Sequence, residues 1–402
     1  MSSTPTTTSP TAVSDAPVVA GSQAHSHGPG SPVPVQTRSE RFASARHDDF
    51  PEVTGYELEW RLTPVSKLRD LIDGELDGSP FPAKVSEATG LVTEWIGRDD
   101  ARIGSAGLAE ERAAANAWSS FEQALSVTLS SEEAVTVTVE REGIDRSPRA
   151  AHTVITARPN SRGTVVLDHR GSARLSENVE IVAQQGSDLT VITLQEWDDE
   201  SVHLASHFAR VERDARLKHV VVSLGGAIVR VNPSAHLAEQ GADGTLLGLY
   251  FSDAGQHLEQ RVYVHHEAPQ TVSRVNYKGA LNGDGARSVW VGDVLIGRDA
   301  TGTDSYEQNR NLVLSDGTRA DSIPNLEIET GDIAGAGHAS ATGRFDDEQL
   351  FYLRARGIPE QEARRLVVLG FLVDVVQKIG APELEERLIA AIEAELAAVE
   401  VV

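Results

Sequence analysis

His338 is the residue whose type and neighbours best suit chemistry in this chain of 402 residues. It lies in the segment Gly331-Asp-Ile-Ala-Gly-Ala-Gly-His-Ala-Ser340, where glycine and alanine dominate. Small neighbours leave room for a ligand or for the backbone of another chain, and a neutral imidazole is a good ligand for iron or zinc. We expect this segment to be a loop between the last strand and the first C-terminal helix. The residue types by themselves favour a solvated loop histidine, so a ligand role needs further support.

Two other groups carry side chains that could do chemistry. The run His265-His266-Glu267 offers two imidazoles and a carboxylate. Neighbouring residues of a strand point to opposite faces, so we expect the two imidazoles to diverge and to serve the structure. Asp293, Asp299 and Asp304 would cleave a glycan only if two carboxyl groups were held at a defined separation. Scattered aspartates in a turn-rich β protein more often close turns, and we interpret them so.

Several catalytic motifs are missing from the sequence. There is no GxxxxGK[ST] phosphate loop, no HExxH zinc motif, no GxSxG nucleophile elbow and no GxGxxG between a strand and a helix. The cysteine count is zero, so this chain alone supplies no disulfide, no thiolate nucleophile and no cysteine metal ligand. ATP hydrolysis by the phosphate-loop route and thiol chemistry are therefore excluded for this chain.

Composition also bounds the partners and the location. The 36 basic and 60 acidic residues give a formal charge of −24, which repels phosphates, so we expect neither nucleic acid nor a membrane as a partner. The first 30 residues show no secretory signal, and no run reaches the roughly 18 apolar residues of a membrane span. Together with the absence of cysteine, these features predict a cytoplasmic protein.

The elements that must position these residues fall into four regions. Residues 1–38 are rich in Ser, Thr, Pro and Ala and are predicted to be a disordered tail, because they bury too little apolar surface to offset their ordering entropy. Residues 39–150 are mixed, with a helix expected over Leu108–Leu125 and alternation from Val135. Residues 151–340 show one short strand after another, separated by Gly, Asn, Asp and Ser. The pattern alone leaves open a sandwich, a barrel or a β-solenoid.

Residues 341–402 form the fourth region, which is predicted to be helical. The expected helices are Phe345–Arg356, a second that begins at Pro359 and a third that begins near Pro382. The stretch Leu366–Val376 is apolar nearly all round, which indicates either burial in its own bundle or a surface that docks a partner. The sequence leaves both interpretations open.

Stretches in the last third of the chain resemble the signature of one known family. In the SufB/SufD family of iron–sulfur cluster assembly proteins, a "PxLEI" strand leads to a "CSHGA" loop and then to "LDEEQLFYLRSRGI". Here Pro324 begins the strand Asn325-Leu-Glu-Ile-Glu329, His338 occupies the histidine position, and Asp346-Asp-Glu-Gln-Leu-Phe-Tyr-Leu-Arg-Ala-Arg-Gly-Ile358 matches the last motif. The resemblance covers about residues 39–400.

The resemblance implies a mainly β fold, with a right-handed parallel β-helix core flanked by N-terminal and C-terminal helical regions. It also implies pairing with a SufB-like scaffold subunit and docking of a SufC-like ABC ATPase on the C-terminal helices. The ATPase-docking candidates are then Phe371, Leu366 and Leu369, and His338 becomes a candidate for cluster assembly. Some members of the family associate with a reduced flavin, and the sequence leaves flavin binding open here.

The sequence departs from the family signature at one position. Ala336 replaces the cysteine and Gly337 the serine of the "CSH" motif. Because iron–sulfur clusters are normally held by Cys thiolates, we expect no cofactor bound stably by this chain alone and a transient cluster shared with a partner. We therefore predict a non-catalytic, SufD-like scaffold subunit of a SufBCD-type complex. The alternatives are a secreted-type β-helix enzyme that acts on polysaccharides and a SufB-like homodimeric scaffold.

Overall fold

The computed structural model describes residues 41–143, 145–344, 347–380 and 382–398. The predicted disordered tail, residues 1–38, lies outside the described residues. Residues from Phe42 onward belong to one compact unit, and this unit contains all of the elements that follow. No helix in the described part of the chain combines the length and the apolar character that a bilayer crossing requires.

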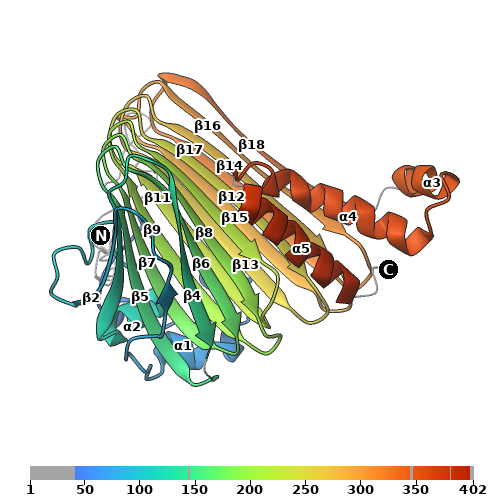
Figure 1. The fold of residues 1–402 in the computed structure, drawn as a ribbon, viewed down its shortest axis with the longest axis horizontal. Helices are drawn as coiled ribbons and strands as arrows, with labels where there is room; N and C mark the ends of the chain where they lie inside the picture. Colours follow the sequence, from blue (N-terminus) through green and yellow to red (C-terminus); the bar gives the residue numbers. More distant parts are fainter. Residues whose placement is uncertain (1–40, 144, 345–346, 381, 399–402) are drawn as a thin grey trace, which may run out of the picture. The chain divides into compact units, whose positions relative to one another are not determined.

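Two nine-stranded sheets dominate the described part of the chain, and successive strands alternate between them (Figure 1). From β3 to β18, each odd-numbered strand lies in sheet A and each even-numbered strand in sheet B, and neighbours within a sheet are parallel. Short antiparallel strands, β1 and β2, close the N-terminal edge of the two sheets. Each pair of consecutive strands is thus one coil of a β-solenoid. The parallel β-helix is confirmed, and an antiparallel sandwich is excluded.

The bounds of the elements show how regular the coils are. Sheet A consists of β2 (Leu91–Gly97), β3 (Gln123–Leu129), β5 (Pro148–Ala157), β7 (Arg174–Ala183), β9 (Val202–Val211), β11 (Ile228–Leu237), β13 (His257–His266), β15 (Arg287–Ile296) and β17 (Arg319–Ile328). Sheet B consists of β1 (Lys84–Val85), β4 (Val135–Gly143), β6 (Arg162–Gly171), β8 (Asp188–Trp197), β10 (Arg216–Ser223), β12 (Asp243–Ser252), β14 (Val272–Leu281), β16 (Thr303–Val313) and β18 (Ile333–Arg344). The helices are η1 (His47–Asp49), η2 (Val65–Lys67), α1 (Arg69–Asp73), α2 (Arg112–Ser120), α3 (Asp347–Ala355), α4 (Glu360–Val376) and α5 (Pro382–Ala398).

The alternating valines of β4 show why these residues form coils. Val137 and Val139 point inward and are buried, whereas Thr136 and Glu140 point outward. Val137 pairs with Val165 of β6, so like residues stack from coil to coil. A fully buried Val contributes roughly 1.5–3 kcal/mol, and stacked rungs bury their faces mainly on one another.

The solenoid starts earlier than residue 151. The helix expected over Leu108–Leu125 ends at Ser120, and the strand β3 follows it. Within β3 the apolar residues alternate, and Leu125 and Leu129 are buried in the core between the sheets. Period-two burial therefore outweighs the helix propensity of the preceding alanines.

Helices cover both outer faces of the solenoid. Near the N-terminus, α2 packs on sheet A, where Trp118 contacts the rings of His152 and Phe208. On the opposite face, α4 and α5 lie across sheet B (Figure 1), and α5 is tied to the sheet by ion pairs of Arg387 with Asp168 and Glu196. One apolar cluster joins the two helices to the sheet, with Val368, Leu372, Val376, Leu388, Ile392 and Leu396 on Ile192, Val220, Val222, Leu247, Leu249 and Phe251.

Candidate functional site

His338 lies in a strand, so the prediction that it sits in a loop is wrong. It is in β18, the last strand of sheet B, and its register partner in β16 is Glu307. The glycines and alanines around it have a low β-strand propensity, which favoured a loop. Backbone pairing with the preceding coil overrides that propensity, because β16 provides a complete template of hydrogen-bonding groups.

Glu307 is a buried carboxyl without a good partner. Its side chain is 1% exposed, and Oε1 lies 3.8 Å from Nδ1 of His338. Neither carboxyl oxygen makes a hydrogen bond of good geometry to another described residue. Burial, with repulsion from the Asp293 carboxylate, raises the pKa of Glu307 to about 8, and the backbone of Asn325 opposes this only weakly. A buried acid with a strongly perturbed pKa is a marker of a functional site.

The end of the solenoid exposes the imidazole of this pair to solvent. β17 and β18 are the last strands of their sheets among the described residues, so each presents one edge. His338 is 45% exposed even though it points toward the core side of the sheet. The ring of Tyr306 approaches Gly337 so closely that a Cβ there would lie 3.3 Å from it. The terminal coil therefore combines strand edges, an accessible imidazole and a carboxyl beneath it.

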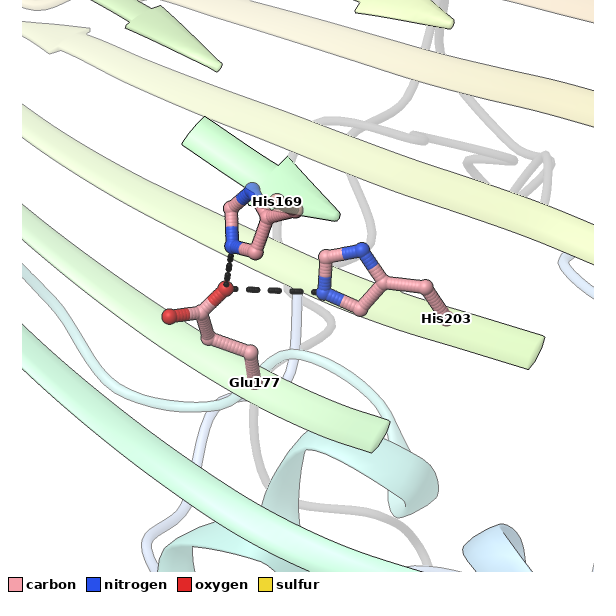
Figure 2. A group of neighbouring side chains, drawn as sticks. All are labelled: His169, Glu177 and His203. Atoms are coloured by element: carbon pink, nitrogen blue, oxygen red, sulfur yellow. Dashed lines mark hydrogen bonds and ion pairs between the residues drawn. The ribbon is translucent and has the colours of Figure 1, made fainter. Parts of the chain in front are cut away.

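A second group of donors lies deep inside the solenoid (Figure 2). The carboxylate of Glu177 faces Nε2 of His169 at 2.9 Å and Nε2 of His203 at 3.4 Å, and all three side chains are fully buried. Arg141, also buried, places Nε 3.2 Å from Oε1 of Glu177. Burial would raise the pKa of Glu177, but the positive charge of Arg141 and the contacts with His169 and His203 hold it well below its ordinary value.

In the inner group of Arg141, His169, Glu177 and His203, the nitrogens of both histidines already face protein partners. The indole N–H of Trp197 donates to Nδ1 of His203 over 3.2 Å, so the ring proton of His203 must lie on Nε2, facing Glu177. Burial lowers the pKa of His203 to about 4 against the opposing hydrogen bond to Glu177, in accord with a neutral ring. Both nitrogens of His169 face acceptors, the Leu194 carbonyl at 3.1 Å and the Glu177 carboxylate. The group is a closed structural network.

A third group lies on the outer face of sheet A. Nδ1 of His236 is 2.6 Å and Nδ1 of His265 is 3.3 Å from Oε1 of Glu267. Burial alone would lower the pKa of His236, but its contacts with Glu110 and Glu267 raise the pKa to about 9. The predicted divergence of His265 and His266 is confirmed, because His266 points inward, where burial lowers its pKa to about 3. The sequence reasoning missed the partner His236, which is one coil away.

The candidates for docking an ATPase occupy different environments on α4. Phe371 is half-buried, and Nζ of Lys278 lies over its ring, 4.7 Å from the centroid. Leu369 is half-buried against the apolar cluster of sheet B, and Leu366 is 39% exposed.

Two aromatic residues of α3 were missed as docking candidates. Phe351 is 75% and Tyr352 57% exposed, and with Glu348 and Ala355 they line an open hollow. Their motif was recognised in the sequence, but exposure depends on the position of α3, which packs against α4 away from the sheets (Figure 1).

Residues 140–371 match the model of the SUF system FeS cluster assembly, SufBD core domain. The chain belongs to the SufBD family of iron–sulfur cluster assembly proteins. The matched region runs from β4 into α4, so it contains almost the whole solenoid, including Glu307 and His338.

Curated SufBD proteins of mycobacteria are similar over nearly the whole chain. An iron–sulfur cluster assembly SufBD family protein of Mycobacterium tuberculosis is 49% identical over 373 residues, 90% of this chain and 94% of that protein. One of Mycobacterium leprae is 48% identical over 377 residues, 91% of this chain and 96% of that protein. One of Staphylococcus saprophyticus is 30% identical over 194 residues, 48% of this chain and 41% of that protein.

Asp293 and Asp304 lie in the strands β15 and β16, so the interpretation that they close turns is wrong for these two residues. Asp293 accepts a hydrogen bond from Asn325 over 2.7 Å, and Asp304 pairs with Arg274. The signal that could have found Glu307 is its place next to Gln308-Asn-Arg-Asn-Leu312, a stretch that also resembles the family. Its burial and its position opposite His338 follow only from the register of the coils.

Proposed function

We propose that this SufBD protein is a cytoplasmic, non-catalytic, SufD-like scaffold subunit of a SufBCD-type complex. The observation that carries the proposal is the pair at the terminal coil, His338 and Glu307. An accessible imidazole and a carboxyl without a good hydrogen-bond partner are suited to an iron ion that arrives from outside. They stand at the open end of the solenoid, where a second chain can approach.

A partner must supply sulfur ligands, because this chain contains no cysteine. Clusters are normally held by thiolates, with histidine in some cases. The edges of β17 and β18 suit such a partner, since an unpaired strand edge is a template for pairing with another strand. His338 would then lie in the interface with a SufB-like subunit, as one protein ligand of the nascent cluster. A SufB-like homodimer of this chain would lack thiolates on both sides, which argues against that alternative.

The energy for assembly would come from a SufC-like ABC ATPase docked on the C-terminal helices. Phe351 and Tyr352 on α3 and Leu366 on α4 support this, because exposed aromatic and apolar side chains are the usual anchors of an interface. The sequence has no phosphate loop of its own. Membership of the SufBD family favours this function over cleavage of polysaccharides.

The experiment is to co-express the chain with SufB-like and SufC-like partners and to compare the wild type with His338→Ala and Glu307→Gln. Complex formation is measured by co-purification, and cluster production by the activity of a cluster-dependent enzyme in the same cells. We expect both variants to assemble the complex and to lose most cluster production. Ser340→Ala, on the same strand and the same face, is the matched control. Wild-type cluster production by His338→Ala would refute the ligand role, and failure of the complex to form would make His338 an interface residue only.

A further inference from the structure

We propose that His236, His265 and Glu267, on the outer face of sheet A, form a binding site for a divalent transition-metal ion of the zinc class. The site is independent of the proposed scaffold function and of the pair at the terminal coil. Two imidazoles and a carboxylate are a donor set that suits such ions. His236 belongs to β11 and His265 to β13, so the ion would bridge two neighbouring coils.

The spacing of the donors fits one ion. The ligand atoms of the three residues lie within 4.8 Å of one another. Oε1 of Glu267 is 2.6 Å from Nδ1 of His236 and 3.3 Å from Nδ1 of His265. Ligands at about 2.0–2.2 Å from a tetrahedral zinc are separated by about 3.3 Å, so a small opening of the group would admit the ion. Binding would displace the proton that His236 shares with Glu267.

Neighbouring residues orient His236 for this role. Ser234 donates its hydroxyl hydrogen to Oε1 of Glu110 over 2.6 Å. Nε2 of His236 faces the Ser234 oxygen at 3.5 Å and Oε1 of Glu110 at 3.9 Å. Nε2 therefore faces acceptors and favours the proton, which leaves Nδ1 for the metal. A metal-bound histidine whose second nitrogen faces a carboxylate is the usual outer-shell arrangement, and its loss costs about 10–100-fold in affinity.

Access and charge separate this site from the inner group around Glu177. The side chains of His236, His265 and Glu267 are 28%, 24% and 33% exposed, so the ion and a completing water can reach them. Glu110 and Glu267 both place acidic oxygens near the His236 ring, and Arg210 of β9 is the register partner of His236. The inner group lies in the dry core beside Arg141, where a dication would meet a buried positive charge.

A metal here would fasten the N-terminal segment to the solenoid. Glu110 lies just before α2, and its contacts with Ser234 and His236 connect that segment to β11. A ligand that binds only the folded state raises the thermal midpoint with concentration. Zinc should therefore stabilise the protein through this site.

The test uses the full chain, stripped of metal, with Zn²⁺ and Co²⁺ as probes. Zn²⁺ stoichiometry and affinity are measured by calorimetry, and Co²⁺ coordination by its visible ligand-field absorption. The variants are His265→Gln and Glu267→Gln. The matched control is Glu132→Gln, which removes an exposed carboxylate outside both candidate metal-binding groups. Circular dichroism and the metal-free thermal midpoint establish that each variant is folded, and Glu267→Gln serves if His265→Gln does not fold.

We expect the wild type and Glu132→Gln to bind one Zn²⁺ equivalent that His265→Gln and Glu267→Gln lose or bind about tenfold or more weakly. The Co²⁺ absorption and the rise of the midpoint with Zn²⁺ should disappear in the same two variants. Glu110→Gln should weaken binding while retaining the stoichiometry, as a positioning residue would. The proposal would be overturned if a folded His265→Gln or Glu267→Gln protein had the same Zn²⁺ stoichiometry, Zn²⁺ affinity and Co²⁺ spectrum as the wild type.

Discussion

Glu307 in β16 lies directly beneath His338 in β18, with Oε1 of the buried carboxyl 3.8 Å from Nδ1 of the exposed imidazole. The folded protein buries this acid without a good hydrogen-bond partner, which is destabilising by itself. Unfavourable arrangements of this kind are found mostly at functional sites, where the rest of the fold supplies the stability that they lose. The unfavourable burial of Glu307 in the last coil therefore supports the proposed binding of iron by this pair.

The first prediction concerns the pH dependence of stability. The pKa of Glu307 is raised from an ordinary 4.5 to about 8 in the folded protein. The stability that depends on keeping Glu307 protonated is therefore complete below pH 4.5 and is lost as the pH rises through about 8, by on the order of 5 kcal/mol. Glu307→Gln should match the wild type near pH 5 and exceed its thermal midpoint near pH 9. Exposed Glu329→Gln is the control, and a midpoint difference that does not change with pH would contradict the prediction.

The sequence predicted strands of the solenoid but not the site in its last coil. Alternation of valines at 135, 137 and 139 predicts a strand with one buried face, and β4 confirms it. Period-two patterns identify which face a residue occupies, but they do not fix which residues of successive coils are opposite. Glu307 and His338 are opposite because of loop lengths between them, which the pattern does not determine. For the same reason, the sequence did not predict that His236 lies beside His265.

The choice of architecture shows a similar limit. Short apolar runs with Gly-containing turns predict strands, and they left a sandwich, a barrel and a solenoid open. Only the resemblance of the motifs around Pro324 and His338 selected the parallel β-helix. The length of the β-solenoid was also underestimated. The strand β3 follows directly after α2, and both were included in one expected α-helix. Residue propensities are a poor guide to the boundary between two elements that follow each other directly.

The second prediction concerns the ion pair between Arg141 and Glu177 inside the solenoid. Both side chains are buried, with Nε of Arg141 3.2 Å from Oε1 of Glu177. Removing one partner leaves an uncompensated buried charge, so Glu177→Gln should destabilise the fold by about 3–5 kcal/mol. Combining it with Arg141→Met should restore part of that loss. Free energies of unfolding from denaturant titration provide the double-mutant cycle, and strictly additive effects would show that the pair is not coupled.

The third prediction concerns Phe371, which the sequence suggested as an anchor for an ATPase. Its ring packs under Nζ of Lys278, and that amine also donates to the Phe371 carbonyl over 3.2 Å. Lys278 in turn pairs with Asp374 at 2.8 Å. Phe371→Ala should therefore lower the free energy of unfolding, by less than the about 3–5 kcal/mol of a fully buried Phe. An unchanged thermal midpoint would show that the ring contributes no packing between α4 and sheet B.

The last prediction separates docking from folding on the C-terminal helices. Phe351 is 75% exposed on α3, so Phe351→Ala should leave the thermal midpoint and the circular dichroism spectrum unchanged. If α3 anchors a SufC-like ATPase, the same substitution should weaken binding by about 1–2 kcal/mol, which is roughly tenfold. Calorimetric titration of the purified chain with the ATPase measures this affinity, and Glu386→Ala, an exposed position on α5, is the control. Unchanged affinity in Phe351→Ala, together with weakened affinity in a folded Phe371→Ala protein, would move the docking surface from α3 to the face of α4 that carries Phe371.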